Sequence, residues 1–123
     1  WKMSDLEAQR IEEILDATEE VLLELGESFP LLINELLNDT PDRLADIERG
    51  LASESGELIM ESAHALKGSL GIFGLPDLVS FCVGLEDAGK AGDFKTCKTL
   101  FFRLQSEMPV VLSALKVIQS ELS

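Results

Sequence analysis

Residues 62–74 read SAHALKGSLGIFG and contain His64, the only histidine of the chain. Around this stretch, apolar residues recur at steps of three and four, which is typical of an amphipathic helix. Its predicted core face consists of Ile59, Ala63, Leu66, Leu70 and Phe73. At about 100° per residue, His64 lies roughly 140° from the middle of that face. We therefore expect the His64 imidazole to point into solvent.

Three neighbours shape the surface around the His64 ring. Gly68 and Gly71 follow four and seven residues later, on the same side of the predicted helix. Helical side chains lean toward the N-terminus, so a large residue at position 68 would cover the imidazole, whereas glycine leaves it accessible. Lys67, three residues after His64, can bring its ammonium toward a group on the ring. These residues together suit a transiently bound phosphoryl group.

The composition favours a single helical domain. The chain has 123 residues, enough for one core, and 46% of them are hydrophobic. The abundance of Leu, Glu, Ala and Lys favours helix over sheet. The apolar runs are short and interrupted by charges, so we expect no membrane insertion and no secretory signal. These features predict a cytoplasmic protein.

The formal charge of −13 is concentrated in the first half of the chain. Residues 1–57 carry a net charge of −12, and residues 58–123 carry −1. Such an acidic chain is a poor ligand for nucleic acid or an anionic membrane, because each phosphate contact needs Lys or Arg. The nearly neutral second half holds His64, where an anionic phosphoryl group would meet little repulsion.

Several other kinds of site are disfavoured. Cys82 and Cys97 lack metal-ligand spacing, and we expect free buried thiols, with a disulfide or redox switch as the alternative. Residues 61–64, ESAH, have the E-x-x-H spacing of di-metal bundles, but such a site needs a second copy of the motif. We therefore expect no metal site. The absence of a P-loop or glycine-rich nucleotide motif predicts that the domain does not phosphorylate itself.

The boundaries of the predicted helices follow from caps and breakers. Ser4 and Glu7 form a potential capping box, and Gly26 ends the first helix. Ser28 is a potential cap of the second helix, and Pro41 either kinks that helix or starts another. We favour a kinked continuous helix. The predicted helices cover residues 4–25, 29–52, 56–73, 76–91 and 94–121, and we expect a kink in the last at Pro109.

Short connections determine how these helices pack. Links of roughly two to five residues force neighbouring helices to run antiparallel. The predicted fold is therefore all-α: an antiparallel up-down-up-down four-helix bundle over residues 28–121, with an additional N-terminal helix. The whole chain, residues 1–123, forms one domain. The N-terminal helix either caps or extends the bundle.

The chain resembles the histidine-containing phosphotransfer (HPt) domains of two-component phosphorelays. Their motif reads approximately A-H-x-L-K-G-[SA]-x-x-x-[FL]-G. The likeness continues at Leu85-Glu86 and at Ala91-Gly92-Asp93, which resemble the end of the family's next helix. It covers about residues 28–121. The motif residues present here are Ala63, His64, Leu66, Lys67, Gly68, Ser69, Phe73 and Gly74.

The resemblance implies a phosphocarrier that exchanges phosphoryl groups with response-regulator receiver domains. In that scheme His64 attacks the phosphorus of a receiver phosphoaspartate through Nε2 and later passes the group to another receiver. Lys67 stabilises phosphoryl charge and Gly68 gives access. This chain binds no cofactor, and Mg²⁺ is expected on the receiver. Sensor or hybrid histidine kinases are the other implied partners.

Some assignments around His64 remain open from the sequence. Candidate partner-binding residues are Met60, Leu70, Gly71 and Phe81, whereas Glu86 is assigned to the family's helix pattern and not to the chemistry. One alternative is the phosphoacceptor domain of a hybrid or chemotaxis-type kinase, whose donor is an ATP-binding domain. Another is a non-catalytic HPt-like helical adaptor.

Overall fold

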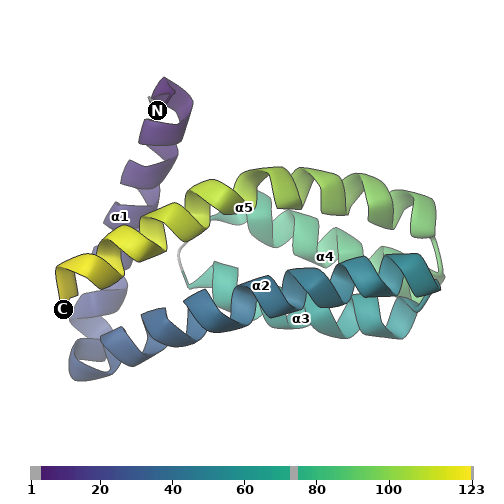
Figure 1. Ribbon diagram of the computed structural model, residues 1–123, viewed down its shortest axis with the longest axis horizontal. Coiled ribbons are helices and arrows are strands. Elements are labelled where there is room, and N and C mark those ends of the chain that lie inside the picture. The colour runs from purple at the N-terminus through teal and green to yellow at the C-terminus, as the bar shows by residue number, and fades with distance from the viewer. Residues whose placement is uncertain (1–3, 73–74, 123) are drawn as a thin grey trace.

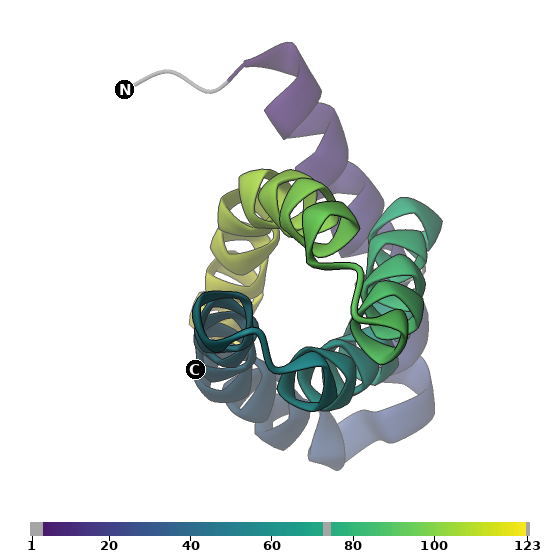
Figure 2. The same cartoon turned by 90° about the vertical axis from the view of Figure 1, so that its right-hand side faces the viewer.

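The computed structural model describes residues 4–72 and 75–122, and these residues form helices with short connections and no strand. The last four long helices of the chain run antiparallel around one core, and the first long helix crosses one end of this bundle (Figures 1 and 2). The predicted all-α bundle with an additional N-terminal helix is confirmed. The elements are α1 (Asp5–Leu25), the short 3₁₀ helix η1 (Gly26–Ser28), α2 (Phe29–Ser53), α3 (Gly56–Gly71), α4 (Pro76–Ala91) and α5 (Phe94–Leu122).

The core is formed by apolar stripes at helical spacing. The predicted stripe of α3 is buried at Ile59, Ala63, Leu66 and Leu70, while Phe73 lies outside the described residues. Burying one Leu or Ile side chain completely stabilises the fold by about 1.5–3 kcal/mol. The other helices supply fully buried side chains that include Ile33, Ile47, Leu78, Leu85, Leu104, Met108 and Leu115.

The ends of α1 follow the predicted caps, but the start of α2 does not. Ser4 Oγ accepts a hydrogen bond from the Glu7 amide and donates one to Glu7 Oε1, both at 3.1 Å. Gly26 ends α1 at a φ of +54°. The predicted Ser28 cap is wrong, since Ser28 makes no side-chain capping bond. Its φ of −80° and ψ of −12° are helical, because η1 runs directly into α2 and leaves no extended cap residue.

Neither internal proline ends its helix. Pro41 lies inside α2 and Pro109 inside α5. Each removes one backbone donor, and each helix continues because its apolar face remains packed on both sides of the proline. The continuity of the helix predicted through Pro41 is confirmed, whereas the kinks expected at Pro41 and Pro109 stay predictions.

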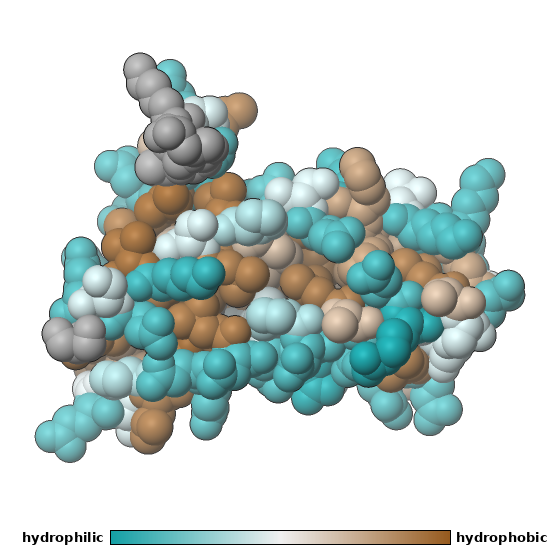
Figure 3. Space-filling view, in the orientation of Figure 1, coloured by the Kyte–Doolittle hydropathy of each residue, from teal (hydrophilic) through white to brown (hydrophobic). Residues whose placement is uncertain are grey.

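Helix α1 caps the bundle because the four bundle helices differ in length. Helices α2 and α5 have 25 and 29 residues, whereas α3 and α4 have 16 each. The longer pair therefore extends beyond the α3–α4 hairpin, and α1 crosses this extension (Figure 1). Figure 3 shows hydrophobic side chains gathered where α1 meets the C-terminal half of α5.

Two kinds of contact hold α1 in place. Ile14 and Thr18 are its buried residues. Arg10 contacts Asp77 at the start of α4 and lies 3.5 Å from Glu107 of α5. Partial burial opposes the charge of Arg10, but the carboxylates, Asp77 above all, outweigh this effect and raise the pKa of Arg10. Arg10 therefore links α1 to both α4 and α5.

Both cysteines are free and buried, as predicted. Desolvation raises the pKa of Cys82 to about 12, and the nearby Glu86 charge adds to the shift. Desolvation also raises the pKa of Cys97. Because the thiolate is the reactive form, both thiols are unreactive at neutral pH. Among the described residues, no helix combines the length and apolar character that a membrane crossing requires.

Candidate functional site

His64 is displayed from the middle of α3. The N-terminus of α3 is capped by Ser55, whose Oγ accepts a hydrogen bond from the Leu58 amide at 3.3 Å. The buried stripe of α3 fixes the rotation of the helix about its axis, so the opposite side faces solvent. The His64 side chain is 70% exposed. The expected orientation of the imidazole is therefore confirmed.

Glu86 of α4 lies beside both His64 and Lys67. Its Oε2 is 3.3 Å from His64 Nδ1, and its Oε1 is 2.8 Å from Lys67 Nζ. Burial of the Glu86 carboxyl opposes its ionisation, but the contacts with Lys67 and His64 outweigh this effect and lower the pKa of Glu86. Glu86 is therefore a carboxylate at neutral pH, and it joins α3 to α4 at the site.

The Glu86 contact selects one form of the His64 ring. An ionised carboxylate can only accept hydrogen bonds, so the proton of a neutral imidazole lies on Nδ1, facing Glu86. Nε2 then carries the free lone pair and points away from this contact. The geometry thus prepares Nε2 as an accessible nucleophile whose ring is held by a hydrogen bond on its other nitrogen.

Glu86 is the site residue that the sequence reasoning missed. We expected it to belong to a helix pattern only, yet it contacts both chemically important side chains of α3. The sequence did contain one indication of its importance, because Glu86 belongs to the Leu85-Glu86 pair that resembles the HPt family. We expected the Lys67 ammonium to reach toward a group on the His64 ring. In the structure, the half-buried Lys67 side chain holds its ammonium against Glu86.

Gly68 and Gly71 leave the surface next to His64 open. Both are exposed, and a Cβ atom added at either position would meet no neighbouring atom within 4 Å. Glycine costs about 1 kcal/mol relative to alanine inside a helix, and no packing contact requires it here. The space left on this side of α3 is therefore available to a binding partner.

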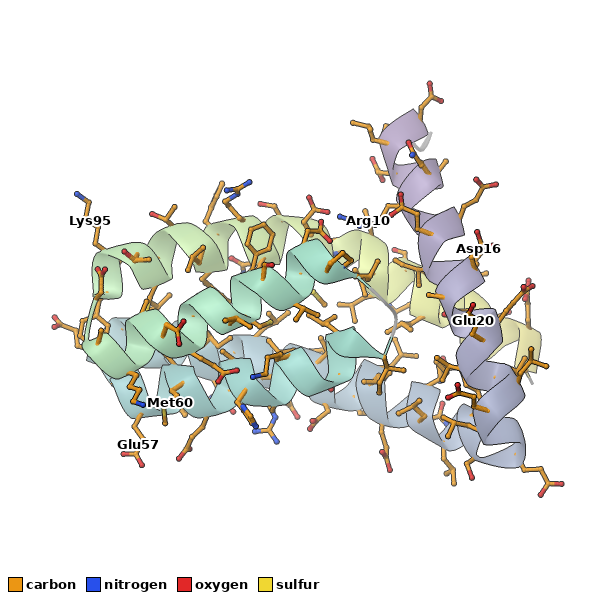
Figure 4. The ribbon with its side chains drawn as sticks, turned by 180° about the vertical axis from the view of Figure 1, so that it is seen from behind. Arg10, Asp16, Glu20, Glu57, Met60 and Lys95 are labelled. Carbon is orange, nitrogen blue, oxygen red and sulfur yellow. The ribbon has the colours of Figure 1, made fainter. Side chains whose placement is uncertain are left out.

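The candidate partner-binding residues fall into different environments. Leu70 is only 3% exposed and belongs to the core, so its assignment to the partner surface is wrong. It lies on the same stripe as Leu66, facing the opposite way from His64. Gly71 is exposed, and Met60, near Glu57 on α3, is half-buried (Figure 4). Phe81 is half-buried under the guanidinium of Arg103, which lies 5.1 Å from its ring centroid.

The geometry of residues 61–64 does not fit a di-metal site. Glu61 and His64 are both exposed. Metal ligands of such bundles project into the interior, between facing helices. In residues 4–72 and 75–122, no three His, Cys, Asp or Glu side chains are grouped closely enough to hold a metal ion.

Fold and site together define a helical phosphocarrier, a bundle that presents one oriented histidine at its surface. The sequence model of the Hpt domain matches residues 31–114, more than half of the chain. The chain belongs to the Hpt domain family, and it functions in histidine phosphotransfer within a phosphorelay. Domains of this family are phosphocarriers rather than catalysts, and their partners are two-component proteins such as receivers and kinases.

A solved structure supports the same fold. The chain is similar to histidine-containing phosphotransfer protein B from Pseudomonas aeruginosa PAO1, with a TM-score of 0.78 and 19% sequence identity. The match covers 86% of this chain and 92% of that chain. A comparison with curated protein sequences finds no match. At this identity the structural likeness concerns the fold, and the roles of individual residues depend on the geometry described above.

Proposed function

We propose that His64 is the phosphoacceptor and that receiver domains are both its donor and its acceptor. The observation that carries this assignment is the contact of His64 Nδ1 with the Glu86 carboxylate, which favours the tautomer with a free lone pair on Nε2 in a side chain that is 70% exposed. Nε2 attacks the phosphorus of a receiver phosphoaspartate, the N–P bond forms, and the aspartate leaves as a carboxylate. The reverse reaction then loads a second receiver. We place this exchange in the cytoplasm.

The residues around His64 act by positioning and charge. As the N–P bond forms, positive charge develops on the imidazole, and the Glu86 carboxylate stabilises the Nδ1–H. Lys67 provides a positive charge one turn from the ring, and Gly68 leaves the approach to Nε2 open. The Mg²⁺ that assists phosphoryl transfer belongs to the receiver. This domain supplies the nucleophile and has no autokinase activity.

The direct test is an incubation with a receiver labelled by acetyl phosphate. The transferred phosphate should be labile in acid and stable in base, as expected for a phosphohistidine. An adaptor that only binds its partner would acquire no such label. A domain loaded by a kinase alone would be labelled by ATP and the kinase but not by a receiver.

Gly68→Leu is expected to slow phosphoryl transfer without destabilising the fold. A side chain at this position meets no protein atom, and leucine gains about 0.8–1 kcal/mol of helix propensity over glycine. It would also lean over the His64 ring. The melting temperature should therefore rise, while the rate of transfer from a labelled receiver should fall. An unchanged transfer rate would show that the glycine does not provide access.

Glu86→Gln is expected to slow transfer roughly tenfold, since a hydrogen bond to a charged group contributes about 1.5–3 kcal/mol and 1.4 kcal/mol corresponds to a factor of ten. The substitution also removes the preference for the Nδ1–H tautomer. Nitrogen-15 chemical shifts of the His64 ring would report this change directly. A slower transfer with unaltered tautomer populations would assign Glu86 a purely structural role.

A further inference from the structure

A groove of about 300 Å³ runs between α2 and α3 immediately beside the His64 site. Gly68 belongs to both features, because it lies one turn from His64 on α3 and also lines the groove. A partner that reaches Nε2 from this side therefore covers the groove as well. The groove is lined on α3 by Ala65, Gly68 and Ser69, at the end of that helix by Ile72, and on α2 by Leu32, Glu35, Leu36 and Asp39.

The two walls of the groove differ in chemistry. The α3 wall carries no charged side chain, and Ile72, directly after α3, adds an apolar side chain that is 36% exposed. The α2 wall presents the exposed carboxylates of Glu35 and Asp39. The groove thus combines an apolar floor with an acidic edge.

The acidic edge keeps a net negative charge. Asp39 pairs with Arg43 at 3.5 Å, but such exposed pairs contribute only about 0–1 kcal/mol and leave the carboxylate hydrated. Among the described residues, no ion pair of Glu35 is found. A second hollow further along α2 is lined by both carboxylates together with Asn38 and Asp42. The negative edge therefore extends along α2, away from the groove.

We propose that the receiver docks in this groove and that Glu35 and Asp39 select receivers with Lys or Arg facing α2. This inference rests on the proposed function and adds the chemistry of the partner's surface. The apolar floor is continuous with the open surface at Gly68, so one docked domain contacts the floor and delivers its phosphoaspartate to His64. The acidic edge then favours a basic receiver and repels an acidic one.

Charges at the edge of an interface act mainly on the association rate and on its salt dependence. Transfer at receiver concentrations below saturation should therefore be fastest at low ionic strength. It should slow as salt screens the pair of charged surfaces, because the Debye length falls to about 8 Å at physiological ionic strength. Receivers without basic residues on the docking face should show no such dependence.

The test uses a panel of purified receiver domains and the double variant Glu35→Lys/Asp39→Lys. The matched control is Asp16→Lys/Glu20→Lys, which makes the same charge change at the same four-residue spacing on α1 (Figure 4). For the fastest receiver of the panel, the groove variant should reduce the second-order transfer rate at least about tenfold at low salt and flatten its salt dependence. The control should remain within roughly twofold of the unmodified protein.

The outcomes separate this inference from the proposed function. Equal loss of rate in both double variants would show that only net charge matters, and an unchanged rate in the groove variant would place the receiver elsewhere. Either result overturns the inference. Direct labelling of the unmodified protein by phosphoramidate needs no receiver and tests His64 separately. Failure of that labelling, together with failure of receiver transfer, would refute the phosphoacceptor assignment and this inference with it.

Discussion

His64→Gln is expected to abolish phosphoryl transfer while leaving the helical content and melting temperature nearly unchanged. The side chain is 70% exposed and its Nδ1 contacts the Glu86 carboxylate, so little packing is lost. Glutamine retains polarity at this position but has no nucleophilic nitrogen. Circular dichroism would check the fold, and phosphate transfer from an acetyl-phosphate-labelled receiver would check the chemistry.

The matched control for this prediction is Glu61→Gln on the same helix. Glu61 is exposed and lies three residues before His64, so its substitution alters surface charge nearby without touching the proposed nucleophile. Transfer should persist in this control. Labelling that survived in the His64 variant would mean that another residue accepts the phosphoryl group.

Gly56→Ala is expected to destabilise the bundle by about 3 kcal/mol, which corresponds to a fall in melting temperature of roughly 10 °C. The backbones of α3 and α4 lie close together here, and a Cβ atom at Gly56 would lie 2.1 Å from the Gly89 carbonyl oxygen. A backbone carbonyl cannot rotate away as a side chain can. The two helices would have to separate, and the contacts around the neighbouring buried Ile59 would loosen.

Gly71→Ala on the same helix provides the comparison. A Cβ atom there meets nothing within 4 Å, so the gain in helix propensity of up to about 1 kcal/mol is not offset by a clash. In chemical denaturation, the free energy of unfolding should therefore fall for Gly56→Ala and rise for Gly71→Ala. Similar changes in both would contradict the close approach of α3 and α4.

Most of the fold was predictable because its signals are local. Periodicity of apolar residues and the caps at Ser4 and Gly26 predicted the helices nearly to the residue. The Ser28 cap failed because sequence alone does not distinguish a turn that ends a helix from one that continues into the next. The crossing of α1 was not predictable, because it depends on how far α2 and α5 extend beyond the hairpin.

In the candidate site, too, the features set by a single helix were predictable and those set by the packing of two helices were not. The exposure of His64 and the openness at Gly68 follow from the rotation of one helix and were predicted correctly. The contact with Glu86 depends on the register between α3 and α4, which no spacing within one helix determines. Leu70 was assigned both to the core stripe and to the partner surface, and the packing of α3 permits only the first.

The position of the phosphoryl group on the labelled protein tests the assignment of His64 as phosphoacceptor most directly. Phosphorus-31 and nitrogen-15 NMR of the chain after transfer from a receiver would identify the bonded atom. We expect a single phosphorylated site, Nε2 of His64, with Nδ1 still protonated beside Glu86. Phosphorus bonded to Nδ1, or to any other residue, would contradict it.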